Sequence, residues 1–279
     1  MPELPEVETY VRDLEPELSG RSVIGASVQW DRTIAAPSVG EFLARIAGQR
    51  FVDFDRRGKY MLLGMERDGN RGDTLIIHLR MTGEVHIYPL DEAIKMKDKH
   101  THVVLILDDG RHMHYRDQRK FGRLWLVDDP AQVLARLGPE PLGEGFTVDG
   151  FAHSLAKRTA AIKGLLLNQS IVAGVGNIYA DEALFLASIH PLRSGSSLKP
   201  AELDRLIESI RVVLMRGIEM KGSSLQNYIR LDGMKGNFQE EHKVFRRTGQ
   251  PCITCGTLVE RIVVTQRSTH FCPTCQVMK

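Results

Sequence analysis

Four cysteines near the C-terminus constrain this chain more than any other feature. They form two Cys-x-x-Cys pairs, Cys252 with Cys255 and Cys272 with Cys275, separated by sixteen residues. This spacing is typical of a four-thiolate zinc site, in which four ligands close the tetrahedral shell and the metal is structural. Clustered cysteines also favour a reducing compartment over scattered disulfides. The sequence therefore predicts one structural zinc ion in a terminal β-hairpin finger.

Composition excludes several classes of protein. The chain has 279 residues, of which 42% are hydrophobic and 26% are charged, as in ordinary globular proteins. No apolar run reaches about 18 residues, and prolines and acids open the chain, so neither a membrane span nor a signal peptide is predicted. The net charge of +2 is uninformative, but residues 111–123 and 243–279 are locally basic. Such basic segments suit a phosphate backbone.

The N-terminus begins Met1-Pro-Glu-Leu-Pro-Glu-Val-Glu8. Proline and acids suit the first turn of a helix, whose apolar stripe would include Val7 and Leu14. Removal of Met1 would expose the secondary amine of Pro2 beside the carboxylate of Glu3. Because an α-amine titrates near pH ~8, part of it is neutral and nucleophilic at cellular pH. Such an amine can attack a sugar carbon and form an iminium, as in Schiff-base catalysis.

Periodicity divides the chain into a β-rich and a helical part. Short Val-, Ile- and Leu-rich segments between residues 21 and 127 predict many short strands, as in a β-sandwich. Residues 138–143 break this pattern and form a linker, after which helices are predicted, including 177–187 and 201–219. The fold class is α+β, with domains 1–137 (β-sandwich, catalytic), 138–238 (helical, with a mobile loop at 221–238) and 239–279 (zinc finger).

A glycine turn opens the helix predicted at 177–187. Gly174 and Gly176 lead into Asn177, a good N-cap residue. Backbone N–H groups at such a helix N-terminus form a ready anion site. A dinucleotide-binding fingerprint is excluded, because no strand precedes the turn and the third glycine is missing.

The opening Pro-Glu-Leu-Pro-Glu-Val-Glu resembles the N-terminus of the formamidopyrimidine-DNA glycosylase family, and further blocks resemble that family along the whole chain. The resemblance implies a β-sandwich, a helix-two-turn-helix and a zinc finger. It also implies that Pro2 is the nucleophile, that Glu3 is the general acid and base, and that Glu6 supports the site. The Arg56-Arg57-Gly58-Lys59-Tyr60 block implies that Lys59 reaches the lesion site and a phosphate.

The remaining blocks imply DNA contacts. His78-Leu-Arg-Met81 places His78 near phosphates and makes Met81 a filler of the gap left by a flipped nucleotide. In Asp117-Gln-Arg-Lys-Phe-Gly122, Arg119 would pair with the orphaned base while Phe121 acts as a wedge. Lys163 and Asn177 would bind the phosphates that flank the lesion. Arg267, in the finger, would contact the phosphate next to it.

The implied activity is that of a bifunctional DNA glycosylase and AP lyase, which excises oxidised purines such as 8-oxoguanine and formamidopyrimidines from duplex DNA in base excision repair. The implied partner is damaged double-stranded DNA, bound by a monomer in the bacterial cytoplasm. Two alternatives stay open. One is an endonuclease VIII-like enzyme for oxidised pyrimidines, which the Leu4-Pro5-Glu6-Val7 opening and the Arg119/Phe121 pair disfavour. The other is a non-catalytic zinc-containing DNA-binding protein, which a retained Met1 would favour.

Overall fold

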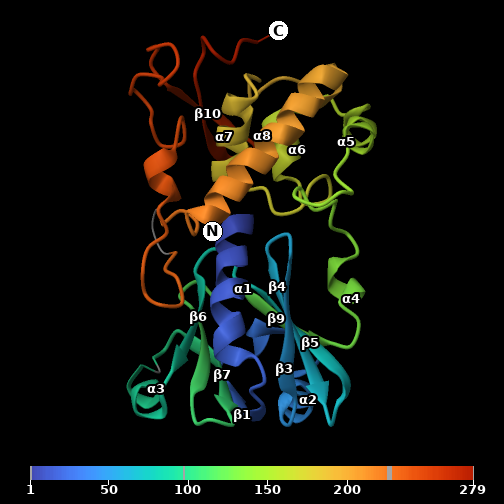
Figure 1. Cartoon of the computed structure of the whole chain (residues 1–279), viewed down its shortest axis with the longest axis vertical. Helices are drawn as coiled ribbons and strands as arrows, with labels where there is room; N and C mark the ends of the chain where they lie inside the picture. Colours follow the sequence, from blue (N-terminus) through green and yellow to red (C-terminus); the bar gives the residue numbers. More distant parts are fainter. Residues whose placement is uncertain (1, 97, 225–227, 279) are drawn as a thin grey trace. The chain divides into compact units, whose positions relative to one another are not determined.

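The computed structural model describes residues 2–96, 98–224 and 228–278, and these fall into two compact units (Figure 1). The first unit comprises Pro2, residues 6–135 and the described part of 223–236. The second comprises residues 3–5, 136–222 and 237–278. The finger thus shares a compact unit with the helices. The predicted division into three domains, with boundaries at residues 138 and 239, stays a prediction.

The first unit is built on two sheets, which confirms the predicted sandwich. One sheet has the strand order β1-β7-β8-β6 and the other β2-β9-β5-β4-β3. All neighbours are antiparallel except β2 and β9. The strands are β1 (Val23–Val28), β2 (Ile34–Ala36), β3 (Arg50–Arg57), β4 (Tyr60–Arg67), β5 (Asn70–His78), β6 (Gly83–Tyr88), β7 (Thr101–Leu107), β8 (His112–Asp117) and β9 (Arg123–Val127).

Four helices accompany these strands in the described residues: α1 (Leu4–Leu18), α2 (Val39–Ile46), α3 (Leu90–Met96) and α4 (Ala131–Leu134). The predicted stripe of α1 is buried, because Val7, Val11 and Leu14 join one hydrophobic core with side chains of both sheets. Ser38 and Glu41 form a capping box that begins α2. Strand β2 and helix α3 were not predicted from the sequence, because both are too short to show a clear period.

The second unit contains α5 (Val148–Leu155), α6 (Ile162–Leu167), α7 (Asn177–Leu186) and α8 (Pro200–Glu219). Proline at the first position of α8 suits a helix start. The predicted apolar face of α8 is buried, from Leu203 through Leu214. Helix α7 is buried on nearly all sides, which explains why its sequence shows little amphipathicity.

The finger carries the hairpin of β10 (Glu260–Val264) and β11 (Arg267–Phe271). Thr265 and Gln266 form its two-residue turn, and both have positive φ, 47° and 59°, as a type I′ turn requires. Phe185 of α7 packs in a small core with Val244, Cys252, Val259 and Cys272. This core holds the finger against α7 within the second unit.

In the part of the chain that the structure describes, no helix is both long and apolar enough to cross a bilayer.

Candidate functional site

The glycine turn before α7 holds the carboxylate of Glu3. Its Oε1 accepts a hydrogen bond from the backbone N–H of Ile178 at 3.0 Å, and Oε2 accepts one from Tyr179 at 3.4 Å. A Cβ on Gly176 would lie 2.2 Å from Cδ of Glu3, so only glycine leaves room for the carboxylate. The anion site predicted at this helix N-terminus is therefore real, and Glu3, which is 3% exposed, fills it.

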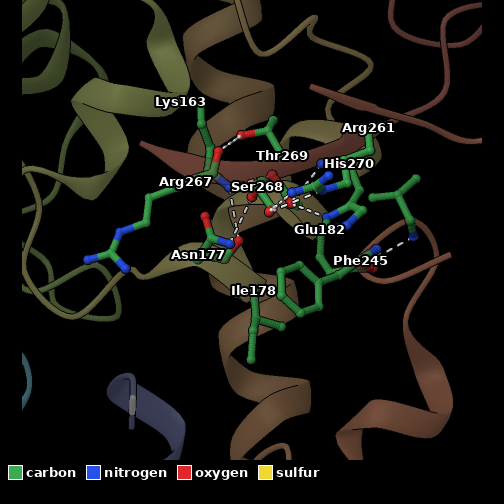
Figure 2. Close-up of polar contacts among 12 residues, drawn as sticks. Lys163, Asn177, Ile178, Glu182, Phe245, Arg261, Arg267, Ser268, Thr269 and His270 are labelled. Atoms are coloured by element: carbon green, nitrogen blue, oxygen red, sulfur yellow. Dashed lines mark hydrogen bonds and ion pairs between the residues drawn. The ribbon is translucent and has the colours of Figure 1, made fainter. Parts of the chain in front are cut away.

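Asn177 is the first helical residue of α7 and not its N-cap, which corrects the prediction. Gly176 is the N-cap, and the Glu3 carboxylate, not a side chain at the N-cap position, accepts from the first-turn N–H groups. The Asn177 side chain instead donates from Nδ2 to the backbone carbonyl of Ser268 at 2.9 Å (Figure 2). Ser268 directly follows Arg267, so Asn177 fixes the backbone at the start of β11.

Lys163 lies in a buried charge cluster. Its ammonium forms an ion pair with Asp181 and donates to the carbonyl of Asn177 at 2.9 Å. The other carboxylate oxygen of Asp181 accepts from both the backbone N–H and Nδ1 of His270, at 3.0 and 3.1 Å. Burial lowers the pKa of Lys163, although the Asp181 carboxylate opposes that shift. This differs from the direct phosphate contact expected of Lys163, because its side chain is 0% exposed.

Glu182 fastens the segment that leads into the finger. Its carboxylate accepts three backbone N–H bonds, from Lys243, Val244 and Phe245, at 2.8 to 3.0 Å (Figure 2). Burial raises the pKa of Glu182, and the three N–H donors oppose that rise. Together with Asp181, this residue attaches both sides of the finger to α7.

Arg267 is exposed at the start of β11. Figure 2 shows its guanidinium extending away from Glu182 and His270. The backbone that carries it is fixed by Asn177 through Ser268. An exposed cation on a fixed backbone is suited to binding a phosphate.

We expect Arg267→Ala to weaken binding to damaged and undamaged DNA alike and to reduce the salt slope by about 1, because one phosphate contact is lost. Fluorescence anisotropy at several salt concentrations measures both effects. Arg267→Lys keeps the charge but not the forked geometry, so it should retain the slope and lose only part of the affinity. An unchanged slope in Arg267→Ala would rule out a phosphate contact.

The four cysteines fit a zinc ion. Their sulfur atoms all lie within 4.8 Å of one another, and no disulfide joins them. The distance from Cys252 Sγ to Cys275 Sγ is 3.9 Å, and from Cys255 Sγ to Cys272 Sγ it is 3.5 Å. Zinc–sulfur bonds of ~2.3 Å in a tetrahedron require sulfur separations of about 3.8 Å. The cluster therefore suits one structural zinc ion, as predicted.

In the first unit, Lys59 is the second residue of the turn between β3 and β4 and is 5% exposed. The hairpin is attached to α1, because Arg56 donates to Glu8 at 2.9 Å. Arg56 also donates to the carbonyl of Gly58 at 3.2 Å, which ties it to the hairpin turn. Lysines at hairpin tips are usually solvated, so the burial of this one fits a functional role.

His78 ends β5, and its Nδ1 accepts a hydrogen bond from the backbone N–H of Arg80 at 3.0 Å. Burial, together with the nearby charges of Arg80 and Lys59, lowers the pKa of His78 to about 3. The imidazole is therefore neutral at cellular pH. With Nδ1 accepting, its proton resides on Nε2, which can donate to an anion.

Met81, Arg119 and Phe121 are brought together, as the resemblance implied. Arg119 Nη1 lies 3.2 Å from the sulfur of Met81, and its guanidinium carbon lies 4.6 Å from the centre of the Phe121 ring. Phe121 is 46% exposed, which is high for a large aromatic side chain. The three side chains form an exposed apolar and cationic group, which we call the wedge cluster.

Pro2 and Glu6 are both buried. The Glu6 carboxylate accepts from the backbone N–H of Ser223 at 2.8 Å, so it anchors the start of the long loop. Tyr10 of α1 donates to the carbonyl of Ile229 at 2.7 Å and anchors the middle of the loop. Residues 225–227 of the predicted 221–238 loop, and Met1, lie outside the described residues.

Four polar residues that support the site were not predicted from the sequence: Asp117, Thr82, Asp181 and Glu182. Each is buried and satisfied by partners far along the chain. The available signal was weak. Asp181 and Glu182 are adjacent acids inside an otherwise apolar helix, and acids are rarely fully buried unless paired.

Known proteins match this chain in three consecutive blocks. The N-terminal domain of formamidopyrimidine-DNA glycosylase matches residues 1–124, its H2TH domain matches 137–228, and the zinc finger found in FPG and IleRS matches 249–277. A formamidopyrimidine-DNA glycosylase of Herpetosiphon aurantiacus is 49% identical over 279 residues, covering 99% of this chain and 100% of the relative. One of Chloroflexus aurantiacus is 48% identical over 282 residues, covering 99% and 98%.

Solved structures agree with the sequence relatives. A Lactococcus lactis variant in complex with Fapy-dG-containing DNA superposes with a TM-score of 0.90 at 37% identity, covering 99% of this chain and 100% of that one. The Thermus thermophilus protein superposes with a TM-score of 0.87 at 42% identity, covering all of both chains. Similarity of this extent in sequence, domain content and fold leads to one conclusion: this chain belongs to the formamidopyrimidine-DNA glycosylase family.

Proposed function

We propose that this chain excises oxidised purines from duplex DNA with the amine of Pro2 as its nucleophile. The chain is a DNA glycosylase with AP-lyase activity that acts in base excision repair. The observation that carries the residue assignment is the Pro2-Glu3 pair, in which Glu3 is held at the N-terminus of α7. The curated relatives carry the name of the purine enzyme, which favours it over the endonuclease VIII-like alternative.

The reaction begins once Met1 has been removed and the Pro2 nitrogen is free. That nitrogen attacks C1′ of the damaged nucleotide, the glycosidic bond breaks, and the base leaves with its electron pair and takes up a proton. The sugar ring opens as the bond from C1′ to O4′ breaks, which leaves an iminium between C1′ and the proline nitrogen. Loss of a C2′ proton then expels the 3′ phosphate, and a second elimination expels the 5′ phosphate.

Glu3 supplies protons in this scheme. Its carboxylate would take up the proton that the proline nitrogen gives up, deliver it to O4′ as the ring opens, and accept a proton during the eliminations. The two backbone N–H groups of α7 hold this carboxylate in one orientation. Glu6 supports the site from the first turn of α1.

The nucleotide must leave the helix before Pro2 can reach its sugar. We assign the wedge cluster to the space left behind, with Phe121 entering the stack, Met81 filling the gap and Arg119 facing the orphaned base. The cation beside an exposed aromatic ring supports this assignment.

Phosphates on both sides of the lesion would be held by several side chains. We assign Lys59, neutral His78, Asn177 and Arg267 to these contacts. Lys163 would hold Asn177 in position, because its ammonium donates a hydrogen bond to the Asn177 carbonyl. The zinc ion, when bound by the four cysteines, supplies no chemistry and orders the finger that carries Arg267.

DNA is the partner of this chain. Solved structures show the Lactococcus lactis relative bound to DNA that contains Fapy-dG or an abasic site. We further propose that the chain acts as a monomer in the bacterial cytoplasm, where its substrate lies. Sedimentation of the purified protein alone and with a lesion duplex tests the monomer.

Borohydride added during turnover should trap a covalent DNA adduct on the N-terminal peptide, because reduction converts the iminium into a stable amine. Peptide mapping by mass spectrometry locates the adduct, and the intact mass shows whether Met1 has been removed. An undamaged duplex is the control. An adduct mapped to Lys59 or another lysine would contradict the assignment of Pro2.

A further inference from the structure

The two segments that carry the wedge cluster meet at a single buried carboxylate, that of Asp117. This residue ends β8 and is 1% exposed. Its Oδ1 accepts from the Thr82 hydroxyl and from the backbone N–H of Arg119 at 3.1 Å, and its Oδ2 accepts from the backbone N–H of Gly122 at 2.7 Å. The carboxylate therefore holds both ends of the 119–122 turn.

Thr82 extends this attachment to the other segment. Its hydroxyl oxygen also lies 3.2 Å from the backbone N–H of Arg119, so that N–H is shared between Thr82 and Asp117. Thr82 directly follows Met81 in the chain. One carboxylate and one hydroxyl thus connect the backbones that carry Met81, Arg119 and Phe121.

The backbone of Asp117 is itself fixed. Its N–H donates to the carbonyl of His100 at 2.9 Å, and its carbonyl accepts from Nε2 of the buried His102 at 2.8 Å. It also pairs with Gly83 at the start of β6. Because the main chain of Asp117 is held on both sides, its carboxylate is a stationary anchor for the turn.

Local sequence preference does not stabilise this turn. Lys120 has a positive φ of 58°, which non-glycine residues rarely adopt without outside support. Gly122 packs so closely that a Cβ there would lie 1.6 Å from the hydroxyl oxygen of Tyr115. The hydrogen bonds to Asp117 therefore maintain a conformation that the segment would not keep on its own.

We propose that Asp117 is the positioning residue of the wedge cluster and that it is required for base displacement although it does not touch DNA. This inference rests on the proposed role of Met81, Arg119 and Phe121. Side chains that enter a base stack must be held rigidly, since the cost of ordering them would otherwise oppose unstacking. Asp117 removes that cost by fixing both segments in advance.

Asp117→Asn is the direct test, because it keeps the shape and replaces one acceptor oxygen with a donor. The new NH₂ group must face a donor: either the Gly122 N–H, or the Thr82 hydroxyl with the Arg119 N–H. Loss of a buried hydrogen bond to a charged group should lower the rate of 8-oxoguanine excision roughly 10- to 100-fold. Cleavage of a preformed abasic site should be largely retained, because no base has to be displaced.

A second measurement reports on the turn without any substrate. Amide hydrogen exchange at Arg119 and Gly122 should be slow in the unaltered protein and faster in Asp117→Asn. A duplex with 2-aminopurine next to a tetrahydrofuran site adds a binding readout, since insertion of the wedge cluster unstacks the probe. The variant should bind this duplex with a smaller fluorescence increase.

Matched variants separate positioning from general damage. Asp128→Asn makes the same change at an exposed carboxylate beyond β9, which accepts from the backbone N–H of Asp129 and from Gln132, and should leave excision unchanged. Thr82→Val removes the shared hydroxyl and should reproduce the defect in weaker form, whereas Thr82→Ser should restore excision. If Asp117→Asn fails to fold, the Thr82 pair tests the same attachment.

Normal excision by folded Asp117→Asn and Thr82→Val would overturn the proposal. So would an equal loss of excision and abasic-site cleavage, because a positioning residue of the wedge cluster should spare the second reaction. An unaltered protein that fails to excise 8-oxoguanine would overturn the proposed function alone, since amide exchange reports on Asp117 independently of substrate.

Discussion

Replacing Glu3 with Gln should lower the rate of base excision roughly 10²- to 10⁴-fold, the usual contribution of general acid–base catalysis, while binding of lesion DNA stays largely intact. Glutamine has the size of glutamate and keeps one oxygen that can accept from the N-terminus of α7. It cannot exchange protons with the sugar. The substitution therefore removes proton transfer by residue 3 and keeps most of the contact that holds its side chain at α7.

Single-turnover excision at saturating protein measures the chemical step, and anisotropy on a tetrahydrofuran duplex measures binding. Glu15→Gln is the matched control, because it makes the same substitution at an exposed position of α1. Thermal unfolding of both variants tests whether the loss of Glu3 weakens α7. Nearly normal excision by Glu3→Gln would exclude this carboxylate as the general acid and base.

Replacing Cys272 with Ser should abolish DNA binding. Cys272 is fully buried and lies in the small core that joins the finger to α7. Zinc binding by such fingers contributes roughly 10–16 kcal/mol to folding, so a missing thiolate should unfold the finger. The sandwich of the first unit has its own hydrophobic core and should stay folded.

Zinc content by atomic absorption, circular dichroism and anisotropy together test this prediction. Thr257→Ser is a control within the finger that alters no thiolate and should keep both zinc and binding. Arg267→Ala separates the two causes of weak binding, because it removes the cation and should leave the metal in place. A zinc-free Cys272→Ser protein that bound and cut lesion DNA normally would show that the finger is not needed to hold DNA.

The sequence by itself determined the features that local spacing encodes. The cysteine spacing predicted the zinc site, since two cysteines with two residues between them can bind the same metal. Short Val-, Ile- and Leu-rich segments predicted the strands of the sandwich, and the period of Leu203 to Leu214 predicted α8. The opening Pro2-Glu3 pair and the Arg119/Phe121 block carried the family resemblance from which the activity followed.

Only the tertiary structure decided which polar groups meet. Glu3 binds backbone N–H groups 175 residues away, and the ammonium of Lys163 is buried against Asp181 although the resemblance implied that it binds a phosphate. Asp117 reaches a hydroxyl 35 residues earlier. The physical reason is that such contacts depend on how separate elements pack against one another. Local periodicity reports which face of an element is buried, but it does not report which element covers that face.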